Sequence, residues 1–294
     1  MERRVRIAMS GASGFIGNYI SKRFVENGHE IVSITRQILK DESALLTTLK
    51  DCEVVINLAG AKIIKKWTPS YKQMLLDSRI GTTKLIANAI KSMKNPPKVF
   101  ISSSAIGIYK SGKNHDENSL EFGDNFLVKI VKEWEEEALR ICSDETRVVI
   151  FRFGVVLGKN GGILKEVLPI FKKGFGGVLG DGKQGFSWIH IEDVYRIFVN
   201  IIKDKNKKGI YNITSPYPED NRVFTKTLGS LLKRPTLCKV PASLLKLKFG
   251  ESSLMLTQGA KVYPQKLIEE DFSFFYSKLN HALENILDKR RDDE

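Results

Sequence analysis

Short apolar runs alternate with longer amphipathic segments through the first half of the chain. The short runs predict buried strands, and the longer segments, whose apolar residues recur at helical spacing, predict helices. Because strands alternate with helices, we expect an α/β fold with a doubly wound parallel sheet. The predicted strands are 5–9, 30–35, 54–58, 98–102 and 147–153, with 38–40 as a stunted strand, and the predicted helices are 15–27, 41–50, 71–91 and 126–141.

The pattern loosens after residue 153. Glycines crowd residues 158–185, which predicts loops outside the sheet that face a substrate. Further helices are predicted at 164–173, 194–203, 222–232, 244–249 and 276–287, and a short strand at 209–213. We therefore expect a sheet domain formed by 1–157 and 187–214, and a small, mainly helical substrate lobe formed by 158–186 and 215–294.

Composition and charge narrow the class of protein. Of the 294 residues 42% are hydrophobic, yet no apolar run approaches the roughly 20 residues that span a bilayer. The charged N-terminus leads directly into the first predicted strand without a signal-like apolar region, so we expect a cytoplasmic protein without membrane contact. The net charge of +13 comes from scattered lysines with interleaved acids, which favours solvated faces over nucleic-acid binding.

Cysteine and histidine spacing argues against metal and nucleophile chemistry. Cys52, Cys142 and Cys238 are far apart, and we expect them to be reduced and mostly buried. The histidines are dispersed, so no metal-ligand set is predicted. No Gly-x-Ser-x-Gly segment occurs, which disfavours a nucleophile-elbow hydrolase.

The most informative stretch is Ser10-Gly-Ala-Ser-Gly-Phe-Ile-Gly17, which follows a predicted strand and opens a predicted helix. Glycines at 11, 14 and 17 let the backbone approach a pyrophosphate, and the helix start offers free N–H groups and a positive dipole end. In this context a glycine pattern predicts a dinucleotide site, and with it an NAD(P)-binding Rossmann fold.

Arg36 follows the second predicted strand, where an acidic residue would favour NAD and an arginine suits the 2′-phosphate of NADP. NADP (NADPH) is therefore the expected cofactor in preference to NAD. Ala59 and Gly60 leave room for the adenosine side, and the hydroxyls of 102–104 end a strand at the edge where ligands bind.

Several motifs carry a family resemblance: the 11–17 glycine turn, Asn57-Leu-Ala-Gly60, the Ser102–Ala105 strand end, and Trp188-Ile-His-Ile-Glu-Asp193. Together they resemble the extended short-chain dehydrogenase/reductases. Further marks are similar to an atypical, NAD(P)-dependent sugar-nucleotide-epimerase-like branch of that family. These marks are Trp67, Lys72, Ser78-Arg-Ile80, Arg152–Gly158, Arg234-Pro235, Val240-Pro241, Phe249-Gly-Glu251 and Pro264-Gln-Lys-Leu267.

The resemblance implies an NADP-binding Rossmann domain and a short C-terminal domain of unknown function at about 243–290. It does not identify the substrate: we expect a small molecule, for which a nucleotide sugar is one candidate. Whether the protein is a monomer or a homodimer stays open. The predicted cofactor-binding residues are Gly11, Ser13, Gly14, Phe15, Ile16, Gly17, Arg36, Leu58, Ala59, Gly60, Ser78, Ser102, Ser103 and Arg152.

The proton-transfer residues typical of this family are incomplete. Such enzymes use a Ser and a Tyr-x-x-x-Lys pair on one helical face, where the lysine lowers the pKa of the tyrosine. Ser104 matches the serine, but 126–141 holds no tyrosine. Phe126, Leu127 or Val128 would take the tyrosine position, and only the Val128 register keeps a lysine, Lys132.

A literal Tyr-x-x-x-Lys does occur at Tyr109 and Lys113, but Gly112 lies inside it and a loop is expected there. Tyr109 is still expected to face the pocket. The helix asparagine of the family is replaced by Ser78. We take Ser104 and Tyr109 as the candidate catalytic residues. The further candidate substitutes are Lys72, Asp124 and His190.

Three hypotheses stay open: an oxidoreductase or epimerase with substitute residues, an NADP-binding redox sensor or regulator without turnover, and a basic NADP-containing protein that binds nucleic acid. His190 precedes a predicted helix and is expected to be a structural or capping residue. The acidic run at 133–137 is interpreted as a solvated helix face.

Overall fold

The computed structural model describes residues 3–141 and 145–288. Its centre is a six-stranded parallel sheet with the order β11-β6-β4-β3-β1-β2. The chain adds β2 on one side of β1 and then β3 on the other, so the strand order reverses at β1. This arrangement confirms the doubly wound α/β fold. The strands are β1 (Arg6–Ser10), β2 (Glu30–Ile34), β3 (Val54–Asn57), β4 (Val99–Ala105), β6 (Arg147–Phe153) and β11 (Gly209–Ile213).

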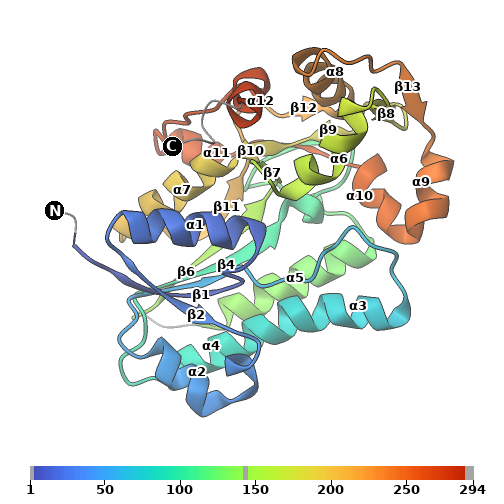
Figure 1. The fold of residues 1–294 in the computed structure, drawn as a ribbon. Coiled ribbons are helices and arrows are strands. Elements are labelled where there is room, and N and C mark those ends of the chain that lie inside the picture. The colour runs from blue at the N-terminus through green and yellow to red at the C-terminus, as the bar shows by residue number, and fades with distance from the viewer. Residues whose placement is uncertain (1–2, 142–144, 289–294) are drawn as a thin grey trace.

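Alternate residues of each strand enter two separate cores, because successive side chains of a strand point to opposite faces. Ile7 and Met9 pack under α1 (Phe15–Glu26), α7 (Ile191–Lys203) and α11 (Gln265–Glu269). Ala8, between them, faces α2 (Glu42–Leu49), α4 (Thr82–Ser92) and α5 (Phe126–Leu139). The two helix layers lie on opposite sides of the sheet in Figure 1.

Local sequence signals explain where these helices begin. Asp41 accepts a hydrogen bond from the backbone N–H of Ala44 and so caps α2. Thr68 caps α3 (Pro69–Leu76), whose first residue is a proline, and Asn125 caps α5 with bonds from two backbone N–H groups. Each cap satisfies donors that the first helical turn leaves free.

Two sequence expectations for this half are wrong. Residues 38–40, expected as a stunted strand, form a short 3₁₀ turn, η1 (Ile38–Lys40). The single helix expected over 71–91 is divided into α3 and α4 by a π-helical turn, η2 (Asp77–Gly81). A π turn inserts an extra residue into a helix and often marks a functional site.

The second lobe lies above the sheet domain in Figure 1 and has a core of its own around Trp188, Phe186, Phe224 and Leu283. Its helices are α6 (Gly162–Lys172), α8 (Asn221–Leu231), α9 (Ala242–Phe249), α10 (Leu254–Thr257) and α12 (Leu279–Leu287), with the 3₁₀ turn η4 (Gly250–Ser253). The expected helical character is confirmed, with bounds shifted by up to three residues.

Four short strand pairs, which periodicity did not predict, stitch this lobe together and to the sheet domain. They are β7 (Val155–Leu157) with β10 (Trp188–His190), β8 (Gly177–Leu179) with β13 (Cys238–Val240), β9 (Gly185–Phe186) with β12 (Glu219–Asp220), and β5 (Asn114–His115) with β14 (Lys261–Val262). Each strand has only two or three residues, too few to show a period of two.

Two burial expectations also need correction. The 133–137 run is not wholly solvated, because Glu135 and Glu137 are buried. Cys52 is buried as expected, but Cys238 is exposed, and Cys142 lies outside the described residues. Within 3–141 and 145–288, no helix is long and apolar enough to cross a membrane, and no three His, Cys, Asp or Glu side chains group as metal ligands.

Candidate functional site

The glycine turn after β1 uses its three glycines differently. Gly11 has a φ of +70°, and a Cβ there would lie 2.7 Å from the backbone of Leu58. A Cβ on Gly17 would lie 2.2 Å from the carbonyl oxygen of Gly11. A Cβ on Gly14 would meet only that oxygen, at 3.2 Å, and Gly14 is exposed. Gly11 and Gly17 therefore close the turn, whereas Gly14 keeps an open face.

That open face is the start of α1. Gly14 occupies the N-cap position and supplies no side-chain acceptor, and the first turn of α1 holds no acidic residue. The N–H groups that begin a helix have no partner within it, and the dipole adds positive potential there. Ser13 is exposed, and Phe15 and Ile16 are half-buried. A helix start with these features binds anions such as phosphate.

Phe15 also explains part of the glycine-rich segment that was expected to face substrate. A Cβ on Gly161 would lie 1.9 Å from the Phe15 ring, and Cβ atoms on Gly158 and Gly162 would lie 2.9 and 3.1 Å from it. These glycines make room for the ring between β7 and α6. The three glycines therefore pack against Phe15 of the glycine turn, which differs from the predicted loop that faces substrate.

The loop after β3 forms the second wall. Asn57 is fully buried, where it accepts a hydrogen bond from Ser10 Oγ at 2.5 Å and donates one to Thr83 Oγ1 at 2.7 Å. These bonds tie the ends of β1 and β3 to α4. We call residues 10–17 and 57–61 the switch-point edge, because ligands of such folds bind where the strand order reverses.

Arg36 lies in an exposed turn just past β2, the strand next to β1. Within the part of the chain that the structure describes, its guanidinium has no ion pair or hydrogen bond. An exposed cation at this end of the sheet is available to an anionic group of a ligand.

Ser78 and Arg79 lie on the η2 turn beside the switch-point edge. Ser78 Oγ accepts a hydrogen bond from the backbone N–H of Ala61 at 3.0 Å, and Arg79 Nη2 donates to the carbonyl of Ala61 at 2.9 Å. The π turn therefore fixes the loop that follows β3 to the start of α4.

The serines of β4 face inward rather than towards solvent. Ser102, Ser103 and Ser104 are all buried, because β4 extends to Ala105, beyond its predicted end. Ser104 Oγ donates to Glu135 Oε1 at 2.5 Å. Ser104 thus points to the buried face of α5.

Glu135 also holds Arg152, the next-to-last residue of β6. Arg152 Nε and Nη2 donate to the two carboxylate oxygens at 2.8 and 2.7 Å, and the pair is almost fully buried. Arg152 Nη1 donates to Tyr109 Oη at 2.9 Å, and Tyr109 donates to Asn212 Oδ1 at 3.0 Å. Ser104, Glu135, Arg152, Tyr109 and Asn212 are called the buried cluster below. The contact predicted between Arg152 and the cofactor stays a prediction that none of these bonds supports.

Electrostatics in the buried cluster oppose phenolate chemistry. Burial raises the pKa of Tyr109, and the nearby Arg152 guanidinium offsets this only in part. The pKa of Arg152 is raised above its usual value by Glu135 despite the opposing effect of burial. A catalytic tyrosine needs a pKa lowered towards the working pH. Tyr109, at 5% exposure, has neither that pKa nor access to solvent.

The start of α5 does not restore the missing pair. Val128 is buried, and the exposed Lys132 lies over the Phe122 ring at 5.2 Å. Asp124 and Lys132 line a surface hollow of about 350 Å³. Lys113, as expected, is in a loop, and it forms an ion pair with Glu121 at 2.5 Å.

Lys72 lies where the two lobes meet. Its Nζ is 2.5 Å from Glu251 Oε2 of η4 and 4.7 Å above the ring of Phe126, the first residue of α5. Trp67 packs edge-on against the same ring. Of the candidate substitutes, Lys72 is thus an ionisable group between the lobes at the start of the helix that would hold the tyrosine.

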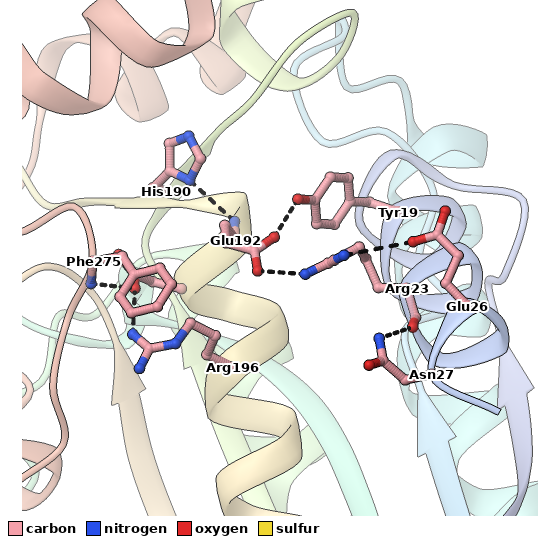
Figure 2. Close-up of polar contacts among 9 residues, drawn as sticks. Tyr19, Arg23, Glu26, Asn27, His190, Glu192, Arg196 and Phe275 are labelled. Atoms are coloured by element: carbon pink, nitrogen blue, oxygen red, sulfur yellow. Dashed lines mark hydrogen bonds and ion pairs between the residues drawn. The ribbon is translucent and has the colours of Figure 1, made fainter. Parts of the chain in front are cut away.

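The Trp188–Asp193 motif forms a structural junction, and Figure 2 shows the contacts of its His190 and Glu192. His190 Nδ1 accepts from the backbone N–H of Glu192 at 3.1 Å and caps α7, which confirms its expected capping role. Burial lowers the pKa of His190 to about 4. Glu192 accepts hydrogen bonds from Tyr19 and Arg23 of α1, at 2.5 and 2.8 Å.

The last residue of that motif binds the C-terminal segment. Asp193 is fully buried and accepts from the backbone N–H groups of Phe275 and Tyr276 at 2.8 and 2.9 Å. Burial raises its pKa, and these bonds oppose the shift. The motif therefore joins α1, α7 and the segment that leads to α12.

Sequence reasoning missed Glu135, Asn212, Glu251 and Arg79. One signal was available: Arg152 lies in an apolar strand, and a buried arginine requires a buried acid. That requirement could have selected a residue from the acidic run of α5. Glu251 lies in one of the family marks, but its pairing with Lys72 could not be read from the sequence, and nothing local in the sequence pointed to Asn212.

Comparison with known proteins places this geometry in a family. Residues 7–214 match the NAD dependent epimerase/dehydratase family, and residues 240–286 match a domain of unknown function, DUF1731. The chain belongs to the NAD dependent epimerase/dehydratase family. The epimerase family protein YfhF of Bacillus subtilis is 33% identical over 98% of this chain and 99% of its own length.

Solved structures in the family have the same fold. The human epimerase family protein SDR39U1, crystallised with NADPH, has a TM-score of 0.90 and 31% identity, covering 96% of this chain and 99% of the human one. A nucleoside-diphosphate sugar epimerase from Corynebacterium glutamicum has a TM-score of 0.78 and 26% identity, covering 97% of this chain and 58% of its own. The match to an atypical, epimerase-like family with a short C-terminal domain is confirmed.

Proposed function

We propose that this protein binds NADP(H) along the switch-point edge and uses it in a hydride transfer to or from a small molecule. The observation that carries the proposal is the start of α1, where an open glycine and unpaired N–H groups have no side-chain acceptor or first-turn acid among the residues that the structure describes. The NADPH present in the human SDR39U1 crystals supports the choice of cofactor.

Each segment of the proposed site would bind a different part of NADP(H). The backbone N–H groups of 15–17 and the open face of Gly14, beside Ser13, would hold the pyrophosphate. Arg36 would bind the 2′-phosphate, and 58–60 would lie along the adenosine side. Ser78, Ser102 and Ser103 would stand nearer the nicotinamide, which accepts or donates the hydride when bound. The cofactor would lie between the sheet domain of 1–157 and 187–214 and the lobe of 158–186 and 215–294.

Cofactor choice is tested by melting temperature and by affinity. A ligand that binds only the folded state raises Tm by mass action, so NADPH should raise it more than NADH at equal concentration. Arg36→Ala should weaken NADPH by about tenfold, as expected for loss of one charge-assisted contact, and leave NADH unchanged. Lys40→Ala, an exposed cation just beyond the same strand, is the matched control. Equal Tm shifts for both cofactors would contradict the role of Arg36.

For the reaction, we propose that proton transfer uses Lys72 in place of a tyrosine, with a nucleotide sugar as the substrate class. The position of Lys72 between the lobes, in contact with Glu251, supports this choice. NADPH oxidation followed by absorbance tests reduction, and NMR of nucleotide-sugar mixtures tests epimerisation, which consumes no cofactor. Lys72→Met should abolish turnover, whereas Lys91→Met on the exposed surface of α4 should not.

The buried cluster favours a second candidate, an NADP-binding regulator without turnover, because Ser104 and Tyr109 are held in the core. The same assays separate the two functions. Tight NADPH binding with silence in both assays would favour the regulator, whereas turnover that depends on Lys72 would exclude it.

A further inference from the structure

Arg79 is a largely buried arginine that has few hydrogen-bond acceptors and no carboxylate partner among the described residues. Its guanidinium makes two hydrogen bonds: Nη2 to the carbonyl of Ala61 at 2.9 Å, and Nη1 to Ser78 Oγ at 3.4 Å. No carboxylate within 3–141 and 145–288 lies within ion-pair distance of it. Burial without a counter-charge lowers its pKa to about 10.

Arg147 shows what a structural arginine without a carboxylate looks like in this chain. Its two terminal nitrogens donate to three backbone carbonyls, those of Lys207, Ile201 and Ile202, at 2.7 to 3.3 Å. Two of these carbonyls belong to the last turn of α7, where the helix dipole favours a cation. Arg147 therefore has its acceptors in the protein, whereas Arg79 keeps most of its five N–H donors for another partner.

The surroundings of Arg79 hold the guanidinium in place without neutralising it. Its central carbon lies 5.5 Å from the ring centre of Trp134, and 3.2 Å from the position that a Cβ on Gly60 would take. Gly60 has no positive φ, so no turn requires a glycine there. The absence of a side chain instead leaves room for the guanidinium of Arg79. The Nε1 of Trp134 is buried and has no acceptor among the described residues.

The Nε donor of Arg79 is not fully buried. Its Nε has no partner in the described residues, yet no Arg79 nitrogen belongs to the buried unpaired atoms of the molecule. The residue is carried by the π turn and lies against Gly60 and Ala61 of the switch-point edge. A planar guanidinium with free N–H groups matches the oxygens of phosphate and carboxylate.

We propose that Arg79 anchors an oxyanion, the phosphate or carboxylate of a bound ligand, at the switch-point edge. The oxyanion belongs either to NADP(H) or to an acidic substrate held beside it, so the assignment rests on the proposed function for its setting. Both sources share one chemistry, and the experiment separates them.

The test measures two probes on purified full-length protein. NADPH affinity is measured by cofactor fluorescence, and inorganic pyrophosphate affinity by calorimetry, on the free protein and on NADPH-saturated protein. The variants are Arg79→Gln, Arg79→Lys and the control Arg140→Gln, which alters an exposed arginine at the C-terminal end of α5. Tm and circular dichroism confirm folding.

Arg79→Gln should weaken one probe by about tenfold or more, the range for hydrogen bonds to charged groups. Loss of NADPH affinity identifies the cofactor as the source. Unchanged NADPH affinity with loss of pyrophosphate binding to the saturated protein identifies the substrate. Arg79→Lys should retain part of the affinity, because the charge stays and the fork is lost. Arg140→Gln should match wild type.

A second variant moves the guanidinium instead of removing it. Gly60→Ala puts a methyl group 3.2 Å from the central carbon, so it should weaken the same probe by less than Arg79→Gln does. If wild type binds pyrophosphate but not NADPH, the proposed function fails while the comparison with Arg79→Gln still tests the anchor. Arg79→Gln protein that binds both probes within twofold of wild type overturns the proposal, as does wild type that binds neither.

Discussion

The switch-point edge and the buried cluster both form at the carboxyl ends of sheet strands, yet they use their polar groups in opposite ways. At the ends of β1 and β3, the first N–H groups of α1 and the guanidinium of Arg36 have no acceptor among residues 3–141 and 145–288. At the ends of β4 and β6, Ser104, Arg152 and Tyr109 bond to Glu135 and Asn212. The first region is prepared for a ligand, whereas the second is complete in itself.

This difference teaches that a strand-end hydroxyl at a ligand-binding edge is not enough to identify a catalytic group. Ser104 and Tyr109 occupy the expected positions, but their hydrogen bonds end inside the protein. A reacting group must present a donor or acceptor to the substrate with a suitable pKa. In this chain the hydroxyls of Ser104 and Tyr109 are already bonded to protein partners, Glu135 and Asn212.

The largest expected effect on stability comes from a substitution in the buried cluster. Glu135→Ala leaves the Arg152 guanidinium buried without its carboxylate, which should cost about 3–5 kcal/mol of unfolding free energy. Urea denaturation measures it. The double variant Glu135→Leu with Arg152→Met removes both charges and should regain much of that stability. A single variant as stable as wild type would show that the cluster does not support the fold.

Much of the fold could be predicted because it depends on local signals. Apolar runs identified the sheet strands, and the glycine turn identified the start of α1, since both depend on neighbours in the sequence. Residues 38–40 were mistaken for a strand because three residues cannot distinguish an extended run from a 3₁₀ turn. The break at η2 was missed because an extra residue changes the phase of the apolar pattern but not its helical period on either side.

The site was less predictable because its partners come from distant segments. Glu135 meets Ser104 across 31 residues of sequence, and Glu251 meets Lys72 from the far lobe. An acidic run on a helix has the same local pattern whether one of its members is solvated or paired in the core. The predicted cofactor-binding turn depends mainly on backbone geometry, which the glycine positions indicate. The candidate catalytic residues depend on pairs of side chains from distant segments.

The second largest effect is a pH dependence. The pKa of His190 is lowered from 6.5 to about 4 by burial, so the unfolded chain takes up its proton first as the pH falls. Stability from this group is therefore full above pH 6.5 and is lost between there and pH 4, by about 3 kcal/mol. Unfolding free energy measured across this range tests the prediction.

His190→Asn is the matched variant for that test, because an asparagine can still cap α7 but does not titrate. Its stability should fall less steeply than that of wild type as the pH decreases from 6.5. Parallel curves for the two proteins would show that His190 becomes protonated in the folded state without penalty. The surroundings of His190 would then stabilise a positive charge better than the burial of this side chain indicates.

A pair of glycine variants sharpens the contrast within the switch-point edge. Gly17→Ala forces a methyl group to 2.2 Å from the Gly11 carbonyl and should cost about 1–3 kcal/mol of stability. Gly14→Ala should stay within about 1 kcal/mol of wild type, because its nearest neighbour is 3.2 Å away. Only Gly14→Ala should lose NADPH affinity at unchanged Tm, since its methyl group enters the open face. Equal stability losses would mean that all three glycines serve the turn alone.

The smallest effect decides whether the buried cluster takes part in chemistry. Ser104→Ala removes one donor to Glu135, whose Oε1 keeps its bond from Arg152 Nε at 2.8 Å, so the cost should be about 1 kcal/mol. NADPH affinity and the rate of NADPH oxidation should be unchanged, because Ser104 is buried and its hydroxyl is bonded to Glu135. Tyr109→Phe, which strips a hydroxyl from the same cluster, should likewise alter stability and not rate. A large loss of rate at unchanged Tm would contradict this prediction. It would show that Ser104 or Tyr109 takes part in the reaction, and that the ligand-binding region extends into the buried cluster.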